Sequence, residues 1–282
     1  MITGRRYDAD LRCASASGTL SALIVQMFAL PMSSGFDLDS LLHFTPPQYV
    51  CERCFALLTD VPANFAYRCP VCDVAYVPTD EFPSVGDYLA ARGLALTYED
   101  VMGHGQRLAE IARQTRAGLT GQLPDYTPMR ALLETIGSAQ HCVHFTTFGI
   151  SAWFVGALKM AAQHIDVRGV ISGIKRDEVF RELTTYASDA PRLQTRLFGQ
   201  ESQWFPHQKI IVIDGLIAFK GSANLTDIGW RKAAHGREVV EVITDIAEVM
   251  ELNNRFFSPV WVGFEQRAQP EASKTAASSY GR

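Results

Sequence analysis

Residues 207–224, which read HQKIIVIDGLIAFKGSAN, contain two apolar runs separated by Asp214 and Gly215. An Asp-Gly pair between apolar runs is the strongest short-range signal for a β-hairpin with a two-residue turn. Segments 208–213 and 216–220 are therefore predicted to pair as antiparallel strands. Because both strands are almost wholly apolar, the hairpin is expected to be buried in the fold.

Polar side chains gather at the open end of this hairpin. His207 and Lys209 are two residues apart, so on a strand they point to the same side. Gly221 lets the backbone approach a ligand closely, and Ser222 and Asn224 follow it. A lysine, a hydroxyl and an amide that converge without an acidic metal-ligand cluster suit an anionic phosphate, and a histidine can attack phosphorus.

The segments around the hairpin alternate between helical and strand patterns over residues 125–264. Helices are predicted for 128–140, 151–164, 176–189 and 246–261, and strands for 141–150, 167–174, 192–198 and 237–245. This alternation predicts an α/β fold with a central mixed β-sheet flanked by helices. His144, on the first of these strands, is expected to point at the sheet edge where His207 lies.

The hairpin resembles the HKD signature of the phospholipase D superfamily at every position, in the pattern His207-x-Lys209-x4-Asp214-x6-Gly221-Ser222-x-Asn224. The flanking elements are similar to that family over residues 125–262, about half of the chain. The resemblance implies a phosphodiesterase that forms a phosphohistidine and needs no metal for catalysis. A second motif histidine then protonates the leaving oxygen and later activates water.

The resemblance also assigns roles within the hairpin. His207 is implied to be the nucleophile or the general acid and base. Lys209 and Asn224 are implied to bind the phosphate, with Ser222 as a supporting hydrogen-bonding group. Asp214 lies in the turn, where the family's aspartate is mainly structural.

Glu238, in the strand predicted after the hairpin, is matched to the acidic residue that orients the motif histidine. The segment between the hairpin and Glu238 is longer than in the simplest family members. The motif occurs once in this sequence, whereas the mechanism needs two histidines. Single-motif members are typically homodimers and many act on nucleic acids, so a site shared across a two-fold axis is expected.

The segment 230–237, WRKAAHGR, supplies Trp230, Arg231, Lys232 and Arg237 without an acidic residue among them. Lys and Arg neutralise a phosphate backbone and an aromatic side chain stacks on bases, so these four are predicted to bind substrate. The alternative is a solvated loop. The net charge of the chain is −4, so nucleic acid would have to be held by such a local patch.

Four of the six cysteines, Cys51, Cys54, Cys69 and Cys72, form two C-x-x-C pairs with fourteen residues between them. This spacing is typical of a zinc ribbon, and two disulfides or one redox pair are the alternatives. Four cysteine ligands leave no open position on zinc, so the metal is expected to be structural. The ribbon is expected to hold nucleic acid or a partner protein.

The sequence is predicted to divide into a helical N-terminal segment (1–48), the zinc ribbon (49–78), a helical connector (79–124), the phospholipase D-like catalytic domain (125–264) and a disordered tail (265–282). In the connector a helix is predicted over 98–118 with Thr97 as its N-cap. The apolar run 19–32 is shorter than the ~20 residues of a membrane span, although it imitates a secretory signal. The cysteines favour a reducing compartment, so a cytoplasmic protein that does not bind membranes is expected.

Three functions are compatible with these features. The favoured one is a metal-independent nuclease that cleaves DNA or RNA. A phospholipase or phosphatidyltransferase is disfavoured by the single motif and the ribbon, and a non-catalytic binding module is disfavoured by the intact signature. No motif in the sequence indicates DNA or RNA, single or double strands, or a particular base as the substrate.

Overall fold

The computed structural model describes residues 46–63, 65–98, 100–123, 125–173, 177–184, 187–198 and 207–263. The predictions for residues 1–45 and for the tail lie outside these described residues. Among the helices that are described, none has both the length and the apolar character needed to cross a bilayer.

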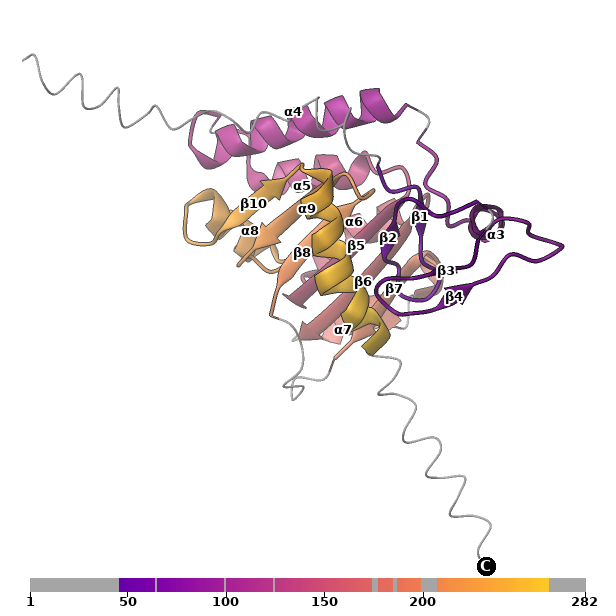
Figure 1. Cartoon of the computed structure of the whole chain (residues 1–282). Coiled ribbons are helices and arrows are strands. Elements are labelled where there is room, and N and C mark those ends of the chain that lie inside the picture. Colours follow the sequence, from indigo (N-terminus) through magenta and orange to yellow (C-terminus); the bar gives the residue numbers. More distant parts are fainter. Residues whose placement is uncertain are drawn as a thin grey trace, which may run out of the picture. The chain divides into compact units, whose positions relative to one another are not determined.

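A six-stranded mixed sheet forms the centre of the described residues, with the strand order β10-β9-β8-β5-β6-β7 (Figure 1). Its strands are β5 (Cys142–Gly149), β6 (Asp166–Gly173), β7 (Leu193–Leu197), β8 (Lys209–Ile213), β9 (Ile217–Gly221) and β10 (Val240–Ile243). The β5–β6 and β6–β7 pairs are parallel, and the other neighbours are antiparallel. The predicted α/β fold with a central mixed sheet is confirmed.

Helices cover both faces of the sheet. They are α4 (Val101–Leu119), α5 (Pro128–Gly137), α6 (Ala152–Ala161), α7 (Asp177–Thr184), α8 (Asp227–Ala234) and α9 (Ile246–Leu252), with a short 3-10 turn η1 (Ala187–Asp189). Side chains from α4 to α8 share one apolar core with Phe145 of β5. On the opposite face α9 and the π-helical segment η2 (Asn253–Phe257) pack on the sheet, and Figure 1 shows α9 lying across the strands.

Gly169 on β6 shows how tightly the helix-covered face is packed. A Cβ atom at this position would lie 1.9 Å from Cζ of Phe145 on the neighbouring strand. The missing side chain makes room for the aromatic ring, which is fully buried. The parallel β5–β6 pair can therefore stay in register over its whole length.

Three predicted boundaries are wrong. The N-cap of α4 is Asp100 instead of Thr97, and the Asp100 side chain accepts a hydrogen bond from the Gly103 amide at 2.9 Å. The hairpin turn is one residue longer than predicted, because Ile213 pairs with Ile217. The closing helix extends past its predicted end but is interrupted by the π-helical turn of η2.

The cysteine region forms two short hairpins, β1 (Tyr49–Val50) with β2 (Leu57–Leu58) and β3 (Tyr67–Arg68) with β4 (Ala75–Tyr76), followed by α3 (Val85–Ala91). We call residues 49–76 the ribbon. The Asn254 side chain accepts from the Leu57 amide at 2.8 Å and donates to the Leu57 carbonyl at 2.9 Å. It therefore completes the free edge of β2 as a strand would, and fastens the ribbon to η2.

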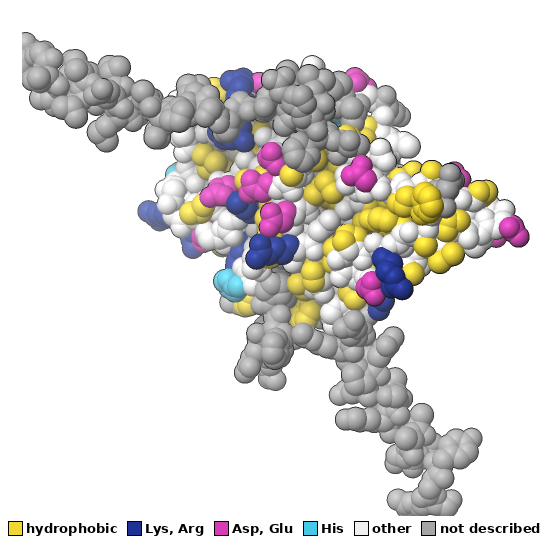
Figure 2. Space-filling view, in the orientation of Figure 1, with side chains coloured by type: hydrophobic (Ala, Val, Ile, Leu, Met, Phe, Trp, Pro, Cys, Tyr) yellow, Lys and Arg dark blue, Asp and Glu magenta, His cyan; other side chains and the backbone are white. Residues whose placement is uncertain are grey.

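Hydrophobic side chains gather on the surface over the ribbon and α3, as Figure 2 shows. Phe65 and Val77 are the most exposed large apolar side chains described there, at 72% and 67%. On the same face of the molecule, Asp and Glu side chains are interleaved with Lys and Arg near α9. The amino group of Lys220 on β9 lies 2.9 Å from Glu248 of α9 and 3.3 Å from Glu241 of β10.

Candidate active site and metal centre

His207 and Lys209 meet at the amino end of β8. The Lys209 amino group donates to Nδ1 of His207 at 2.8 Å and to the His207 carbonyl at 2.6 Å. Lys209 is buried, whereas His207 is exposed. Burial lowers the pKa of Lys209, and the charge of Glu238 acts in the opposite direction. The two side chains therefore share one end of the sheet, as the two-residue spacing predicted.

Ser222 and Glu238 lie beside this pair. Gly221 pairs with Lys209 on one side and with Val240 on the other, so β9 carries the site between two strands. A Cβ on Gly221 would lie 2.0 Å from the Val239 carbonyl oxygen, so glycine permits this close approach. The Ser222 hydroxyl donates to Glu238 and accepts from the Val239 amide at 2.9 Å.

Glu238 itself precedes β10 instead of lying within the strand, which corrects the prediction. Among the described residues its hydrogen bond goes to Ser222 and none joins it to His207. The carboxylate fixes the Ser222 hydroxyl and supplies a negative charge near Lys209. Its link to the site therefore runs through Ser222.

Asn224 joins the site to β5. Its side-chain oxygen accepts from the amides of Phe148 and Gly149 at 3.1 and 3.2 Å. The oxygen is thereby used to hold the end of β5, so the amide nitrogen is the group that could donate to an anion. The Phe148 ring lies 5.5 Å from the His207 ring.

The sequence reasoning missed Phe148 and Thr146. The Thr146 hydroxyl donates to the Gln208 carbonyl at 3.0 Å, which fixes the segment between the two motif residues. The signal available in the sequence was the pair Thr146 and Thr147 in a strand whose other residues, apart from His144, are not polar. Its meaning depended on the pairing of β5 with β8, which is a long-range contact.

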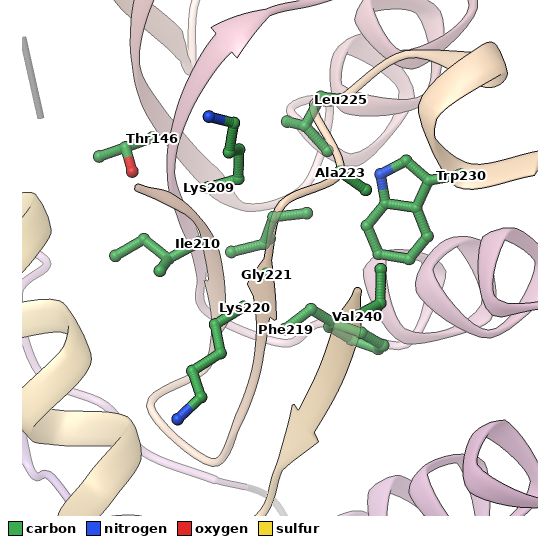
Figure 3. A pocket seen from close by; sticks show the side chains of 11 residues that line it. Thr146, Lys209, Ile210, Phe219, Lys220, Gly221, Ala223, Leu225, Trp230 and Val240 are labelled. Carbon is green, nitrogen blue, oxygen red and sulfur yellow. The ribbon is translucent and has the colours of Figure 1, made fainter. Parts of the chain in front are cut away.

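A small cavity lies beneath Lys209 (Figure 3). Figure 3 shows Lys209 and Lys220 extending in opposite directions from adjacent strands, with Gly221 between them and Trp230 on the far side. The cavity volume of about 10 Å³ is close to the smallest that holds one water molecule. The cavity itself therefore has no room for a substrate.

Trp230, one of the four residues predicted to bind substrate, lies in the core, so its predicted role is wrong. Its side chain is 2% exposed and packs against Phe154 and Phe219, so it cannot stack on a base. Arg231 is exposed but pairs with Asp227, one turn earlier on α8. The two other members of the group, Lys232 and Arg237, are exposed. Of the four predicted residues, these two therefore remain candidates for contact with a substrate.

Asp214 lies at the opposite end of β8 from His207 and is fully buried. Its carboxylate accepts from the amides of Gln140, His141 and Cys142 at 2.8 to 3.0 Å, and from Nε2 of His104 at 2.8 Å. A φ of 54° also places Asp214 in the left-handed region that the turn requires. Its contacts are those of a residue that holds β5, β8 and α4 together.

We expect Asp214→Ala to lower the free energy of unfolding by about 3 to 5 kcal/mol, because four hydrogen-bond donors, two of them in fully buried bonds, lose their acceptor. Chemical denaturation followed by circular dichroism measures the change. Glu251→Ala is the matched control, since this carboxylate is 63% exposed and, among the described residues, pairs with Arg255 alone. The control is expected to change stability by less than about 0.5 kcal/mol. Equal effects of the two substitutions would contradict the structural role of Asp214.

His144 does not point at the sheet edge where His207 lies, and that prediction is wrong. It lies near the amino end of β5, where its ring stacks on Phe257 with centroids 4.6 Å apart. Its Nδ1 lies 2.8 Å from the side-chain oxygen of Asn253. Successive residues on a strand face opposite sides, and His144 faces η2 and the ribbon.

The four predicted metal ligands, Cys51, Cys54, Cys69 and Cys72, form one cluster whose sulfur atoms all lie within 4.8 Å of one another. The Sγ atoms of Cys51 and Cys72 are 3.6 Å apart, and those of Cys54 and Cys69 are 3.5 Å apart. Four thiolates around a tetrahedral ion with bonds of about 2.3 Å would be about 3.8 Å apart. These residues could therefore hold a metal ion.

The two C-x-x-C turns have the same backbone geometry. In the first, the Cys51 amide donates to the Ala56 carbonyl and the Phe55 amide to the Cys51 carbonyl. Cys69, Asp73 and the Val74 carbonyl repeat this pattern in the second turn. Phe55 and Asp73 both have left-handed backbone, with φ of 57° and 58°. Each turn presents two sulfur atoms to the same point.

A known domain family and several solved structures are similar to parts of this chain. Residues 132–261 match the family described as "Cardiolipin synthase, PLD-like domain". NucT from Helicobacter pylori is 20% identical, with 45% of this chain and 84% of NucT covered and a TM-score of 0.36. The phospholipase D family member Nuc from Salmonella typhimurium is 21% identical, with 48% and 84% covered and a TM-score of 0.38.

The archaeal chromatin protein TrmBL2 is 13% identical, with 68% of this chain and 74% of TrmBL2 covered and a TM-score of 0.32. No curated protein sequence matches the chain. The family match begins within α5, includes all six strands of the central sheet and ends at residue 261 in the closing helix. The ribbon lies outside it.

Proposed function

We propose that residues 132–261, which form a phospholipase D-like domain, make this protein a metal-independent phosphodiesterase that cleaves nucleic acid. The observation that carries the proposal is the convergence of His207, Lys209 and Ser222 at one end of the sheet. The histidine is exposed to substrate, and the lysine beside it is held in place by the His207 carbonyl.

In the proposed reaction, His207 attacks phosphorus and the bond from phosphorus to the leaving oxygen breaks. Lys209 turns from Nδ1 of His207 to the phosphate and neutralises its charge, and the Asn224 amide group donates to a phosphate oxygen. A second His207, from the partner of a homodimer, protonates the leaving oxygen. That histidine then takes a proton from water, which attacks phosphorus and releases His207 from the phosphohistidine.

The open surface at His207 favours a polymer as the substrate. A phosphodiester within a long strand must pass across the site with chain on both sides, and the exposed His207 permits this. The cavity beneath Lys209, at about 10 Å³, is far smaller than an acyl chain requires. The exposed Lys232 and Arg237 would add backbone contacts.

We further propose that the four cysteines hold zinc, because four thiolates in a tetrahedral arrangement are its preferred structural ligands. Bound zinc would fix the ribbon, and with four cysteine ligands it would offer no open position to a substrate. Catalysis at His207 would then need no metal. A reducing compartment would keep the cysteines available for the ion.

Cleavage of DNA or RNA is expected to proceed in EDTA at a rate within about twofold of that in magnesium, because no step involves a metal at the reacting phosphate. A panel of single- and double-stranded DNA and RNA, with phosphatidylcholine vesicles alongside, measures the substrate class. A strict requirement for magnesium would contradict the mechanism. Hydrolysis of the lipid alone would contradict the assignment to nucleic acid.

A further inference from the structure

A second cavity lies at the end of the sheet opposite to His207. Its volume is about 350 Å³, within the range of small-molecule sites. One wall is formed by residues 92–96, after α3, and the other by the amino ends of β5 and β6. The cavity is therefore separate from the proposed catalytic site.

The charge of this cavity is positive. Arg92, Arg168 and Arg192 line it, and Asp166 is the one carboxylate among its described lining residues. Arg168 is 9% exposed and is held by Asp166, with a distance of 2.9 Å between Nη1 and Oδ2, and by the Phe55 ring, whose centroid is 3.8 Å from Cζ. Arg92 and Arg192 are exposed. Three guanidinium groups and one carboxylate give a net charge of about +2, which an anion with two negative charges would balance.

The same wall also presents buried acceptors. The Asn253 amide nitrogen donates to the Phe55 carbonyl at 3.0 Å, so its oxygen must face His144 and accept from Nδ1. Burial, followed by the charge of Arg168, lowers the pKa of His144 to about 3, so the ring is neutral at pH 7. Nε2 of His144 is therefore an acceptor. Within the described part of the chain it has no hydrogen-bond partner, although the residue is fully buried.

Three further buried atoms of the cavity lining lack hydrogen-bond partners among the described residues. They are Nε of Arg168, a donor, Oε1 of Gln140, an acceptor, and Nε2 of His141. All three residues line the cavity. A buried polar atom without a partner destabilises the protein, so a ligand that satisfies these atoms would recover that cost. Such a ligand must combine negative charge with its own hydrogen-bond donors.

We propose that this cavity binds a phosphate monoester that carries hydroxyl or amino donors, such as a nucleoside monophosphate or a sugar phosphate. The phosphate would lie against Arg92, Arg168 and Arg192, and the donors of the ligand would reach His144 and Gln140. Inorganic phosphate would contact the three arginines but would not reach His144 and Gln140. The ester is therefore the better ligand.

Isothermal titration calorimetry of the full chain tests this, with AMP, ribose 5-phosphate and inorganic phosphate as probes. Lys209→Ala is used as the background, so that phosphate binding at the proposed catalytic site does not contribute heat. We expect at least one of the two esters to bind at least tenfold more tightly than inorganic phosphate. Tighter binding of AMP than of ribose 5-phosphate would identify a nucleotide, and equal affinities would identify the sugar phosphate as the recognised part.

Variants of exposed arginines test the location. Arg92→Ala combined with Arg192→Ala is expected to weaken ester binding at least tenfold. The control combines Arg113→Ala with Arg255→Ala, which removes two arginines that are 67% and 68% exposed and pair elsewhere, and it is expected to bind as the background does. His144→Phe keeps an aromatic ring and is expected to abolish the preference for esters over inorganic phosphate.

The proposal is overturned if no probe binds, if inorganic phosphate binds as tightly as both esters, or if the paired Arg92 and Arg192 substitutions leave the affinity unchanged. Because binding heat is measured without cleavage, these outcomes are independent of the proposed phosphodiesterase activity.

Discussion

Replacing His207 with alanine is expected to lower the rate of phosphodiester cleavage by about 10³-fold or more, because the histidine forms the covalent intermediate and moves the proton. The His207 side chain is exposed, so the free energy of unfolding should change by less than about 0.5 kcal/mol. Cleavage in EDTA and a denaturation curve measure the two effects. His235→Ala is the matched control, since His235 is also exposed, and it should retain activity.

The same variant tests the shared site when it is mixed with wild-type protein. Under random exchange at equal amounts, about a quarter of the dimers are wholly wild type and about half are mixed. If a mixed dimer has one histidine and no activity, the rate per wild-type chain falls to about half. A rate per wild-type chain that stays constant after verified exchange would show that each chain works alone. Full activity of His207→Ala would contradict the catalytic assignment itself.

Loss of the metal centre is expected to have the largest effect on stability. Cys54→Ser removes one of four thiolates that converge within 4.8 Å, and structural zinc in such sites contributes roughly 10 kcal/mol or more. We expect the variant to be purified without zinc and residues 49–76 to lose protection from amide hydrogen exchange. The contacts of the ribbon with Asn253 and Asn254 should be lost with it.

Cys142→Ala provides the comparison for the metal centre. Cys142 is buried but lies outside the cluster, so its substitution should leave the zinc content at one per chain. Elemental analysis of protein made in zinc-replete medium measures this. Wild-type protein without metal, or Cys54→Ser that keeps a full equivalent of zinc, would contradict the zinc assignment.

The sequence alone was sufficient to predict those features that depend on residues close together in the chain. The Asp-Gly turn predicted the β8–β9 hairpin, because left-handed backbone at Asp214 and Gly215 is encoded by those two residues. The alternation of helical and strand patterns predicted the central mixed sheet. The spacing of two C-x-x-C pairs predicted one cluster of four cysteines, since each pair closes its own turn.

Only the tertiary structure decided which polar residues meet. Trp230 lies in a basic segment, but the helix periodicity of α8 turns it inward against Phe154 and Phe219. The exposed surface of that segment therefore has no aromatic platform. His144 and Thr146 lie on the same face of β5. His144 contacts Phe55 of the ribbon, whereas the Thr146 hydroxyl bonds to Gln208, next to His207, because β5 spans the sheet from end to end.

The partners of Asp214 and Glu238 were also beyond the sequence. Asp214 bonds to the amides before β5 and to His104 of α4, more than seventy residues away in the chain. Glu238 reaches Ser222 because β10 pairs with β9. Local spacing determines turns and strand faces, whereas burial and pairing depend on the order of strands in the sheet and on the helices that cover it, which arise only when distant segments pack together.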